Sequence, residues 1–530
     1  MLTKDMEYHP VVYSLKETPG YFMSRAKALL ILLAFVSLVI VLIVLAVMLA
    51  QQKGTQGKVC ESKDDPTDEK SSLSPLSCDV VVVGGGISGL YMAETLMRRK
   101  KEHDVCLFEK DSRFGGKNYD VAFKKAQNVS LSMGAWRVNT AHKKTLNLAE
   151  RLNISMLKMP PLSIDYLEGR GIYADNHQSF KEKAFPTLMS TVFANMTPSQ
   201  MFAFAWRNMS KEKALEYPSY HNFLCQRVGS EGCAFLDLIY GIKMNYNMER
   251  STLTIYDIKN GIKSTSEYVR PRGGLSEIVD ALAKSVKRFG VRMYAKEAVS
   301  SINRDGEPNT FVVRTEHYLV SAKKVIVAIP FLPLKEINGD IAFEIKNHAY
   351  FTPIIGQKCF KAVAIYKHPW WENATSIHNM SLKTWKRYVS SATCLMYMMP
   401  YSRGPQGEGI IQLSYNYFDC AVKWGQLSKL PRATFLSELN KAVQAVFPGM
   451  VVPKPLDVKF KYWEACWHYT KAGSNVSRQD TEEWAKRPFP GEEVYIVGEA
   501  FAVIVGWNEG ALQTAYKALK EGWGIEEPEP

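Results

Sequence analysis

The sequence predicts an α/β protein built around a parallel sheet, and three apolar segments carry this prediction. Residues 80–83 (VVVV) are apolar without alternation, as expected for a strand that helices cover on both faces. Residues 105–109 (VCLFE) and 494–497 (VYIV) have the same character, although they lie near opposite ends of the chain. The sheet is therefore expected to gather strands from distant parts of the sequence.

A glycine-rich turn follows the first of these strands. Gly84, Gly86 and Gly89 fit the pattern Gly-x-Gly-x-x-Gly and lead directly into a helical pattern. Such glycines allow a tight turn, close approach to a pyrophosphate and close packing of helix on strand, and the helix N-terminus favours phosphate. Glu109 ends the second strand, where its carboxylate can accept hydrogen bonds from a ribose diol. These features predict a Rossmann-like dinucleotide-binding unit rather than a glycine turn of another kind.

The turn after Glu109 indicates which dinucleotide binds. Residues 113–117 (RFGGK) are cationic and glycine-rich. They resemble the Arg-Gly-Gly-Arg segment of FAD-dependent amine oxidases, in which backbone and cation face the pyrophosphate. Lys117 stands where that family usually has arginine, and lysine keeps the charge without the bidentate fork.

The C-terminal part of the chain carries the second half of this resemblance. Residues 494–500 (VYIVGEA) and 506–515 (GWNEGALQTA) resemble the segments that close the FAD site of the family. The resemblance implies that Glu499 touches the ribityl–pyrophosphate region, and that the helix start at Ala511 faces the flavin. It places Trp507 beside the isoalloxazine; the tryptophan is the form of L-amino-acid oxidases, whereas monoamine oxidases usually have tyrosine.

Two internal segments fit the same family. Residues 268–279 (YVRPRGGLSEIV) resemble the helix start before the adenine-side strand, Val299 lies where a valine backbone meets the adenine, and residues 324–330 (KVIVAIP) are typical of a returning strand. The resemblance covers about residues 77–524 and implies FAD as cofactor. The cofactor contacts that it implies are Gly84, Gly86, Ser88, Gly89, Glu109, Arg113, Gly116, Lys117, Gly134, Ala135, Trp136, Arg137, Val299, Glu499, Trp507 and Ala511.

Lys361 and Arg137 are the main catalytic candidates, with Trp507 and Tyr397 beside them. Lys361 precedes a pair of tryptophans by the same number of residues as the family's lysine precedes its Phe-Trp pair. In the family, that lysine holds a water near the flavin and is linked to reoxidation of the flavin by oxygen. Arg137 stands where L-amino-acid oxidases carry the arginine that grips the substrate carboxylate. A structural carboxylate is the alternative partner of Arg137, because a buried arginine needs an anion. Tyr397 is a second candidate for the carboxylate, one residue out of register.

FAD is expected to be bound noncovalently. Cys466 comes too early after Trp463 to match the cysteine to which monoamine oxidases attach the flavin. His468 has no counterpart in the two enzyme groups, and is either a further acid–base group or an ordinary partly buried histidine. No metal site is expected, because the sequence has neither a C-x-x-C pair nor an H-E-x-x-H motif.

The N-terminal region predicts a single-pass type II membrane protein. Residues 28–50 are uncharged and almost wholly apolar, which is long enough to cross a hydrocarbon core of ~30 Å. A cleaved signal peptide is the alternative, but its apolar core is typically only ~7–15 residues. Residues 1–27 would then form a cytoplasmic tail and residues 51–76 a flexible stalk. Seven N-x-S/T sequons favour a lumenal or extracellular catalytic part: Asn128, Asn153, Asn195, Asn208, Asn373, Asn379 and Asn475.

Cysteine content and charge add to this interpretation. Disulfides are permitted in such a compartment, and Cys225 with Cys233, or Cys60 with Cys78, could close local loops. The odd count of nine leaves at least one cysteine free or intermolecular. The net charge of +13 is spread along the chain, which indicates modest attraction to anionic surfaces or substrates and no nucleic-acid binding.

The expected architecture interleaves an FAD-binding domain with two others. Residues 77–140, 265–332 and 455–525 are assigned to the FAD domain, residues 141–264 to a mostly helical subdomain, and residues 333–454 to a mixed α+β substrate domain. Helices are expected at residues 144–152 and 432–446. The sequence leaves open whether the protein forms a homodimer.

The leading functional hypothesis is oxidative deamination of an L-amino acid, giving keto acid, ammonia and hydrogen peroxide with O2 as acceptor. The first alternative is a polyamine or monoamine oxidase. The second is a catalytically silent flavoprotein fold kept as a surface glycoprotein. Flavin-dependent isomerisation or desaturation also stays open.

Overall fold

A computed structural model describes residues 73–161, 163–239, 249–261, 265–373, 386–390, 393–447 and 450–526. The chain separates into two units, Met1–Ser72 and Leu73–Pro530, and the fold described here is that of the second. The expected tail and membrane span, and the stalk up to residue 72, lie outside the described residues. Within the described part of the chain, every helix is too short or too polar to span a bilayer.

The first sheet has seven strands, with a parallel centre. Its members are β1 (Ser74–Val83), β2 (Val105–Glu109), β10 (Arg292–Ala295), β11 (Ser301–Arg304), β12 (Phe311–Arg314), β13 (Tyr318–Val327) and β19 (Val494–Ile496). β1 pairs in parallel with β2 and β13, and the end of β13 pairs in parallel with β19. The three apolar segments that predicted the sheet are therefore confirmed as its strands.

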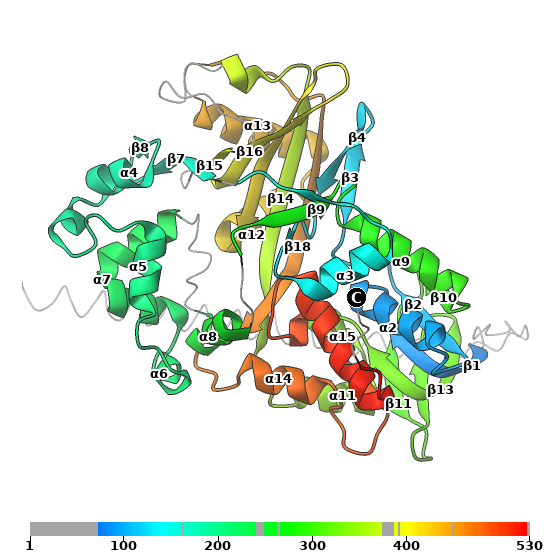
Figure 1. Cartoon of the computed structure of the whole chain (residues 1–530). Coiled ribbons are helices and arrows are strands. Elements are labelled where there is room, and N and C mark those ends of the chain that lie inside the picture. The colour runs from blue at the N-terminus through cyan, green and yellow to red at the C-terminus, as the bar shows by residue number, and fades with distance from the viewer. Residues whose placement is uncertain are drawn as a thin grey trace, which may run out of the picture. The chain divides into compact units, whose positions relative to one another are not determined.

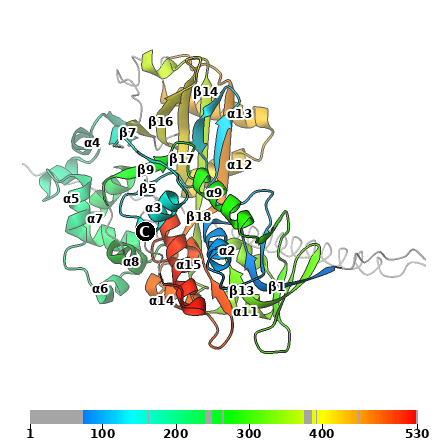
Figure 2. The ribbon, with the colours of Figure 1, turned by 45° about the vertical axis from the view of Figure 1, so that its right-hand side comes forward.

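Helices cover both faces of this sheet, as the unbroken run of valines requires. Val80 and Val82 pack on one helical layer and Val81 and Val83 on the other, because successive side chains of a strand point to opposite faces. The first layer contains α2 (Ile87–Arg98), α3 (Lys143–Arg151), α9 (Ser276–Arg288) and α15 (Asn508–Trp523), and the second contains α10 (Phe331–Glu336), α11 (Asp340–Asn347) and α14 (Arg478–Ala485). Helix α15, red in Figures 1 and 2, lies beside α2, in blue, so segments from both ends of the described chain meet on one face.

A second sheet stands next to the first. Its order is β18 (Asp457–Thr470), β14 (Ile354–Tyr366), β17 (Gly409–Tyr417), β16 (Leu395–Arg403), β15 (Lys386–Ser390), β7 (Ser163–Gly169) and β8 (Ile172–Ala174). Helices α12 (Phe418–Leu427) and α13 (Arg432–Val446) pack on it through an aromatic core that includes Phe360, Trp424 and Phe435. The helix expected at residues 432–446 is confirmed with the same bounds, and the helix expected at residues 144–152 is α3, shifted by one residue.

Residues 141–264 are mostly helical, as expected, but they also contribute short strands. Besides α3, the helices are α4 (His177–Ala184), the short 3-10 helix η1 (Pro186–Ser190), α5 (Pro198–Ala205), α6 (Lys211–Leu215), α7 (Tyr220–Ile239) and α8 (Thr252–Gly261). However, β7 and β8 belong to the second sheet. β6 (Met156–Lys158) pairs with β9 (Tyr268–Pro271), and β9 also pairs with β5 (Val138–Asn139). A further hairpin joins β3 (Asp120–Phe123) to β4 (Ala126–Ser132). β5, β6 and β7 pair with strands that are remote in sequence, so local pattern did not reveal those pairings.

Four disulfides join described residues: Cys78–Cys106, Cys225–Cys233, Cys359–Cys466 and Cys394–Cys420. The Cys225–Cys233 pair confirms the expected local loop. The expected pair of Cys60 with Cys78 is wrong, because Cys78 faces Cys106 across the adjacent strands β1 and β2. Cys60 lies outside the described residues.

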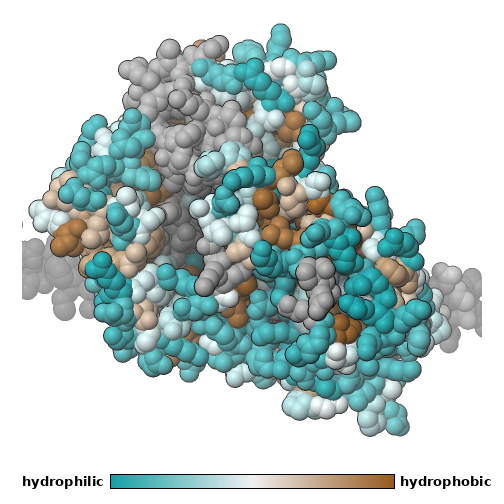
Figure 3. Space-filling model, viewed as in Figure 1, coloured by the Kyte–Doolittle hydropathy of each residue, from teal (hydrophilic) through white to brown (hydrophobic). Residues whose placement is uncertain are grey.

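Polar residues dominate part of the surface. The lower part of the face in Figure 3, where α14 and α15 lie, is mostly hydrophilic. Exposed large apolar side chains come from separate elements, among them Val192, Phe343 and Val451. The buried apolar side chains of the two helical layers and of the aromatic core pack between the helices and the two sheets.

Candidate functional site

A cavity of about 650 Å³ lies at the carboxyl ends of β1, β2 and β13. Ligand sites in open α/β sheets lie at this edge. Strands β14, β17 and β18 of the second sheet form the opposite wall through Lys361, Tyr415 and Trp463. Thirteen of the residues singled out in the sequence line it: Gly84, Gly86, Ser88, Glu109, Gly116, Lys117, Gly134, Ala135, Val299, Lys361, Glu499, Trp507 and Ala511.

The glycine-rich turn has the geometry that a pyrophosphate needs. Gly84 has φ +106°, a backbone conformation that favours glycine, and a Cβ on Gly89 would lie 2.0 Å from the Gly84 carbonyl oxygen. A Cβ on Gly86 would meet no atom within 4 Å, so the space beside it belongs to the cavity. Gly86 is also the N-cap of α2 and its helix has no side-chain cap, which leaves backbone N–H groups available for an anion.

Glu109 is held at the end of β2 by backbone donors. The Gly85 N–H donates to its Oε2 at 2.8 Å and the Asp111 N–H to its Oε1 at 2.9 Å. Burial raises the pKa of this carboxyl, and the two N–H groups oppose that shift. The carboxylate is thus fixed in direction at the cavity edge, in the position expected for a ribose acceptor.

Arg113 does not line the cavity. Its guanidinium donates to the carbonyls of Phe114 and Asn118 at 3.2 Å and to that of Gly116, and it lies 4.4 Å from the ring centre of Tyr119. These contacts hold the turn in shape. Gly116 and Lys117 of the same turn do reach the cavity.

Lys361 lies deep in the wall formed by β14. It is 3% exposed, and its Nζ donates to the carbonyls of Gly134 at 2.7 Å and Ser132 at 3.3 Å. Burial lowers the pKa of Lys361 to about 7, with a further contribution from the charge of Arg137. The amine can therefore gain or lose a proton near neutral pH, as a group that exchanges protons during turnover must.

Arg137 and Trp507 meet through a shared aromatic neighbour. The Arg137 guanidinium lies 3.7 Å from the ring centre of Tyr268, and that ring stacks with Trp507 at 6.2 Å and 11°. His142, whose pKa burial lowers to about 4, packs edge-on against Trp507 at 4.7 Å. Trp507 lines the cavity, whereas Arg137 and its neighbour Trp136 are not among its lining residues.

Tyr397 belongs to a group of tyrosines on β16 and β17. Its ring lies 6.5 Å from Tyr415, which in turn lies 4.7 Å from Tyr417. Tyr397 has φ +54°, a left-handed conformation that is strained for a tyrosine. Only Tyr415 of the three lines the cavity, 4.3 Å from the Lys361 ammonium.

Sequence reasoning did not find Tyr415 or Trp467 as parts of this site, and it named Tyr268 only as the start of the segment 268–279. Trp467 lines the cavity from β18, as does Trp463 of the same strand. In the sequence, Trp463 served only as the reference point for the position of Cys466. Tyr415 and Trp467 come beside β14 only through the pairing of β17 and β18 with that strand, so no local motif marks them. Tyr415 was detectable only from the apolar alternation of its strand, which predicts burial and not function.

The Cys359–Cys466 disulfide also lines the cavity. It joins β14 to β18 where the pairing register shifts between Gln357 and Cys359, next to Trp463 and Trp467. Because the Cys466 sulfur is already bonded, it is not available for attachment to a flavin, which fits noncovalent binding.

Removal of this disulfide tests its place in the cavity wall. We expect C359A/C466A and the matched control C394A/C420A each to lower the free energy of unfolding by about 2–4 kcal/mol. Only C359A/C466A should also weaken FAD binding, because only that disulfide supports the cavity. Titration of flavin-free protein with FAD measures the difference, and equal affinities in the two variants would show that the wall does not depend on the bond.

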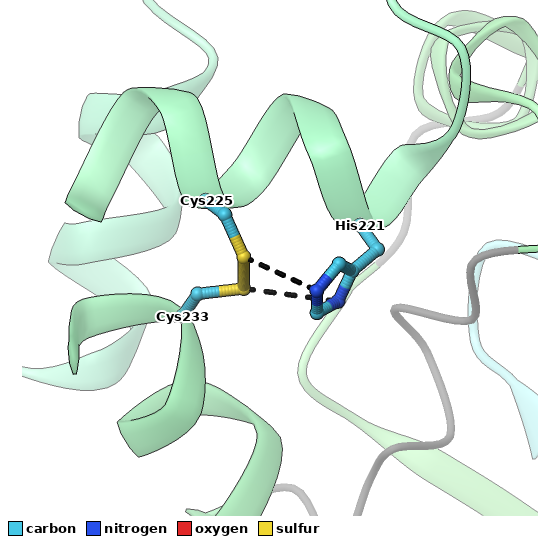
Figure 4. Close-up of side chains that lie close together, drawn as sticks. All are labelled: His221, Cys225 and Cys233. Atoms are coloured by element: carbon cyan, nitrogen blue, oxygen red, sulfur yellow. Dashed lines mark hydrogen bonds between the residues drawn. A yellow bond between two sulfur atoms is a disulfide. The ribbon is translucent and has the colours of Figure 1, made fainter. Parts of the chain in front are cut away.

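One group of metal-ligand side chains occurs in the described part of the chain. The ligand atoms of His221, Cys225 and Cys233 lie within 4.8 Å of one another. The two sulfurs are bonded to each other and contact the imidazole at 3.4 and 3.9 Å, as Figure 4 shows. With both thiols used in the disulfide, this cluster offers a metal only the histidine.

The cavity suits FAD from end to end. Glu109 and Val299, which would hold the adenosine, line it, as do the Gly86 turn and Lys117, which would hold the pyrophosphate, and Lys361 and Trp507, which would lie beside the flavin. The open space at Gly86 and the free N–H groups of α2 match an anionic pyrophosphate. The residues present therefore fit the cofactor that the motifs implied.

Comparison with known proteins identifies the family of the chain. The chain is 24% identical over 482 residues to amine oxidase [flavin-containing] B of Bos taurus, covering 84% of this chain and 86% of that protein. It is 20% identical to aplysianin-A of Aplysia kurodai, covering 88% and 93%. The structure of a putrescine oxidase double mutant superposes with a TM-score of 0.65 at 15% identity, covering 85% of this chain and 100% of the other. The pattern that defines the flavin containing amine oxidoreductases matches residues 87–518, so the chain belongs to that family and uses FAD.

Proposed function

We propose that the protein catalyses the oxidative deamination of an L-amino acid, giving a keto acid, ammonia and hydrogen peroxide. The observation that carries this proposal is the state of Arg137, which is half-buried and packed on the rings of Tyr268 and Trp136. No carboxylate of the described residues forms an ion pair or hydrogen bond with it. A partly buried guanidinium without an anion is costly, and the carboxylate of an amino acid would satisfy it.

The positions of the charges support this arrangement. The charge of Arg137 contributes to lowering the pKa of Lys361, and it opposes the rise that burial causes in the pKa of Tyr415 and Tyr417. Arg137 therefore shares one electrostatic environment with the cavity wall. An anion bound at Arg137 would lie within reach of the same groups.

Each side chain then has a defined task. FAD, when bound, accepts the hydride from the substrate. Arg137 binds the carboxylate and orients the Cα–H bond, and the rings of Trp507 and Trp463 exclude water. Lys361 Nζ, with its pKa near 7, holds or moves a proton at the wall where oxygen must arrive.

A polyamine or monoamine is the second candidate substrate. Glu464 lines the cavity from the exposed side of β18, and its carboxylate accepts a hydrogen bond from the Tyr462 hydroxyl at 3.3 Å. A carboxylate there could pair with an ammonium of a diamine. The fold likeness to putrescine oxidase is compatible with this reading, although at 15% identity it concerns the fold alone.

Anaerobic titration of the FAD-bound protein separates these candidates. Bleaching of the flavin spectrum by L-amino acids, reversed by air with release of peroxide, is the expected result. Bleaching by polyamines alone would assign the second candidate. A bound flavin that neither class reduces would contradict both and favour a binding role or a different flavin reaction.

We also propose that the catalytic part lies in an oxidising lumenal or extracellular compartment and is anchored by the membrane span expected at residues 28–50. Four disulfides support this, since such bonds are rare in the cytosol. So does the exposure of five sequon asparagines: Asn128, Asn153, Asn195, Asn208 and Asn475. Asn379 lies outside the described residues.

Removal of N-linked glycans tests this location. The protein from a eukaryotic host should gain electrophoretic mobility after treatment with a glycan-removing amidase. A variant with all seven sequon asparagines changed to glutamine should show no such gain. An untreated wild-type protein that already migrates with the variant would contradict the proposal.

A further inference from the structure

Strand β18 places a buried histidine directly behind the cofactor cavity. The His468 side chain is 0% exposed and does not line the cavity itself. Its backbone N–H donates to Glu499 Oε1 at 2.9 Å, and its Nδ1 lies 2.8 Å from Glu499 Oε2. Because a carboxylate can only accept, the hydrogen of the imidazole is assigned to Nδ1. One residue thus donates to both oxygens of one carboxylate.

Glu499 is the link between His468 and the cavity. It lines the cavity together with Lys117, whose Nζ lies 3.2 Å from the same Oε2, and its Oε1 also accepts from the Gly506 N–H at 2.8 Å. Burial alone would raise the pKa of Glu499, but the charge of Lys117 and the hydrogen bonds from His468 and Gly506 hold it well below its usual range. The carboxylate is therefore ionised, with four donors around it.

The donors differ in how well they fix direction. A lysine ammonium is a point charge on a flexible stem, so Lys117 attracts the carboxylate without setting its orientation. The N–H and Nδ1–H of His468 form a rigid fork, because both belong to one residue of a paired strand. His468 is the contact that fixes the plane of the Glu499 carboxylate.

The other imidazole nitrogen shows that packing alone does not account for this histidine. His468 Nε2 is buried and has no hydrogen-bond partner among the described residues. Burial also lowers the pKa of His468, so the ring is neutral and its Nε2 lone pair is left unsatisfied, which destabilises the fold. An apolar side chain would avoid this cost but could not donate to Glu499.

We propose that His468 is a positioning residue for the cofactor, which orients the Glu499 carboxylate at the cavity wall through a two-point hydrogen-bonded fork. The proposal does not depend on the substrate, because it concerns only how the empty protein is prepared to receive FAD. It is therefore independent of the amino-acid oxidase assignment.

The test measures FAD affinity of the full-length, flavin-free protein by fluorescence titration. We expect H468A to raise the Kd for FAD about tenfold to a hundredfold, as loss of a hydrogen bond to a charged group would. H468N should recover part of the affinity, since its amide can donate in place of Nδ1–H. H348A is the matched control: His348 is half-buried and stacked on Trp484 at 4.4 Å, remote from the cavity lining, and should bind FAD as wild type does.

A double-mutant cycle separates orientation from general damage to the fold. In an E499Q background, H468A should cause clearly less further loss of affinity than in wild type, because the charged partner of the fork is already gone. Thermal unfolding of each flavin-free variant shows which of them fold, and H468N stands in for H468A if the alanine variant does not. Unchanged FAD affinity in H468A, or an undiminished loss in the E499Q background, would overturn the proposal.

Discussion

Replacement of Lys361 by methionine is expected to make the protein more stable and much less active. The pKa of Lys361 is about 7 in the folded protein, against 10.5 for an ordinary lysine. Between these pH values the unfolded chain binds more protons than the folded protein, so wild-type stability falls as the pH drops from about 10.5 to about 7. Methionine has a similar shape and no proton to bind, so K361M should lack this slope.

The gain in stability at pH 7 should be less than the roughly 5 kcal/mol that the pKa difference implies. The reason is that the carbonyls of Ser132 and Gly134 lose their donor in the variant. Urea unfolding at pH 7 and pH 9.5 measures the effect, with K367M as control for a lysine outside the cavity lining. An identical slope in K361M and wild type would show that Lys361 is not the titrating group.

The same variant should slow reoxidation of the flavin by oxygen about 100-fold, in the range found for removal of one charged or proton-transferring group. Stopped-flow mixing of the reduced enzyme with oxygen isolates this step from substrate reduction. A K361M enzyme that reoxidises at the wild-type rate would remove the role assigned to Lys361, whatever happens to its stability.

Replacement of Arg137 by alanine should have the second large effect, on substrate recognition. We expect kcat/KM for L-amino acids to fall by a factor of roughly 30 to 1000, the cost of about 2–4 kcal/mol for truncating one partner of a buried charge pair. The kcat/KM of R137K for L-amino acids should lie between the values for wild type and R137A, because lysine keeps the charge but loses the bidentate guanidinium fork. The flavin spectrum without substrate should not change if Arg137 acts only on the carboxylate.

A matched pair of substrates controls this experiment. An amine with the same side chain and no carboxylate should be oxidised equally by wild type and R137A. R207A serves as protein control, since Arg207 packs on Phe204 at 5.3 Å but is exposed on the helical region. Equal losses of activity toward amine and amino acid would contradict the carboxylate contact.

The parts of the site that could be predicted are those that local sequence encodes. The glycine turn at Gly84, the carboxylate of Glu109 and the register of Lys361 each depend on neighbours within one short segment, and all three line the cavity. The aromatic wall formed by Tyr415 and Trp467 depends on how distant strands pair, and sequence periodicity carries no information about that pairing.

The same limit explains the errors in the fold. Residues 163–169 were taken as part of a helical subdomain, but β7 pairs with β15, more than 200 positions later in the chain. Cys78 was assigned to a cysteine near it in sequence, whereas its partner Cys106 is near it only across the sheet. In both cases the deciding contact is made by the tertiary fold.

The position of β19 in the first sheet has a consequence for the folding of the protein during its synthesis. Strands β1 and β2 leave the ribosome early, yet β1 needs β13, and β13 needs β19, which is synthesised some 390 residues after β2. At about 5–20 residues per second, the delay is roughly 20 to 80 s. During this time the valines of β1 have neither a complete sheet nor α15 to cover them, which makes the nascent chain prone to aggregation. Because Glu499, Trp507 and Ala511 complete the cavity, it can form only after they are synthesised, so the supply of chaperones at the site of synthesis should govern the yield of active protein.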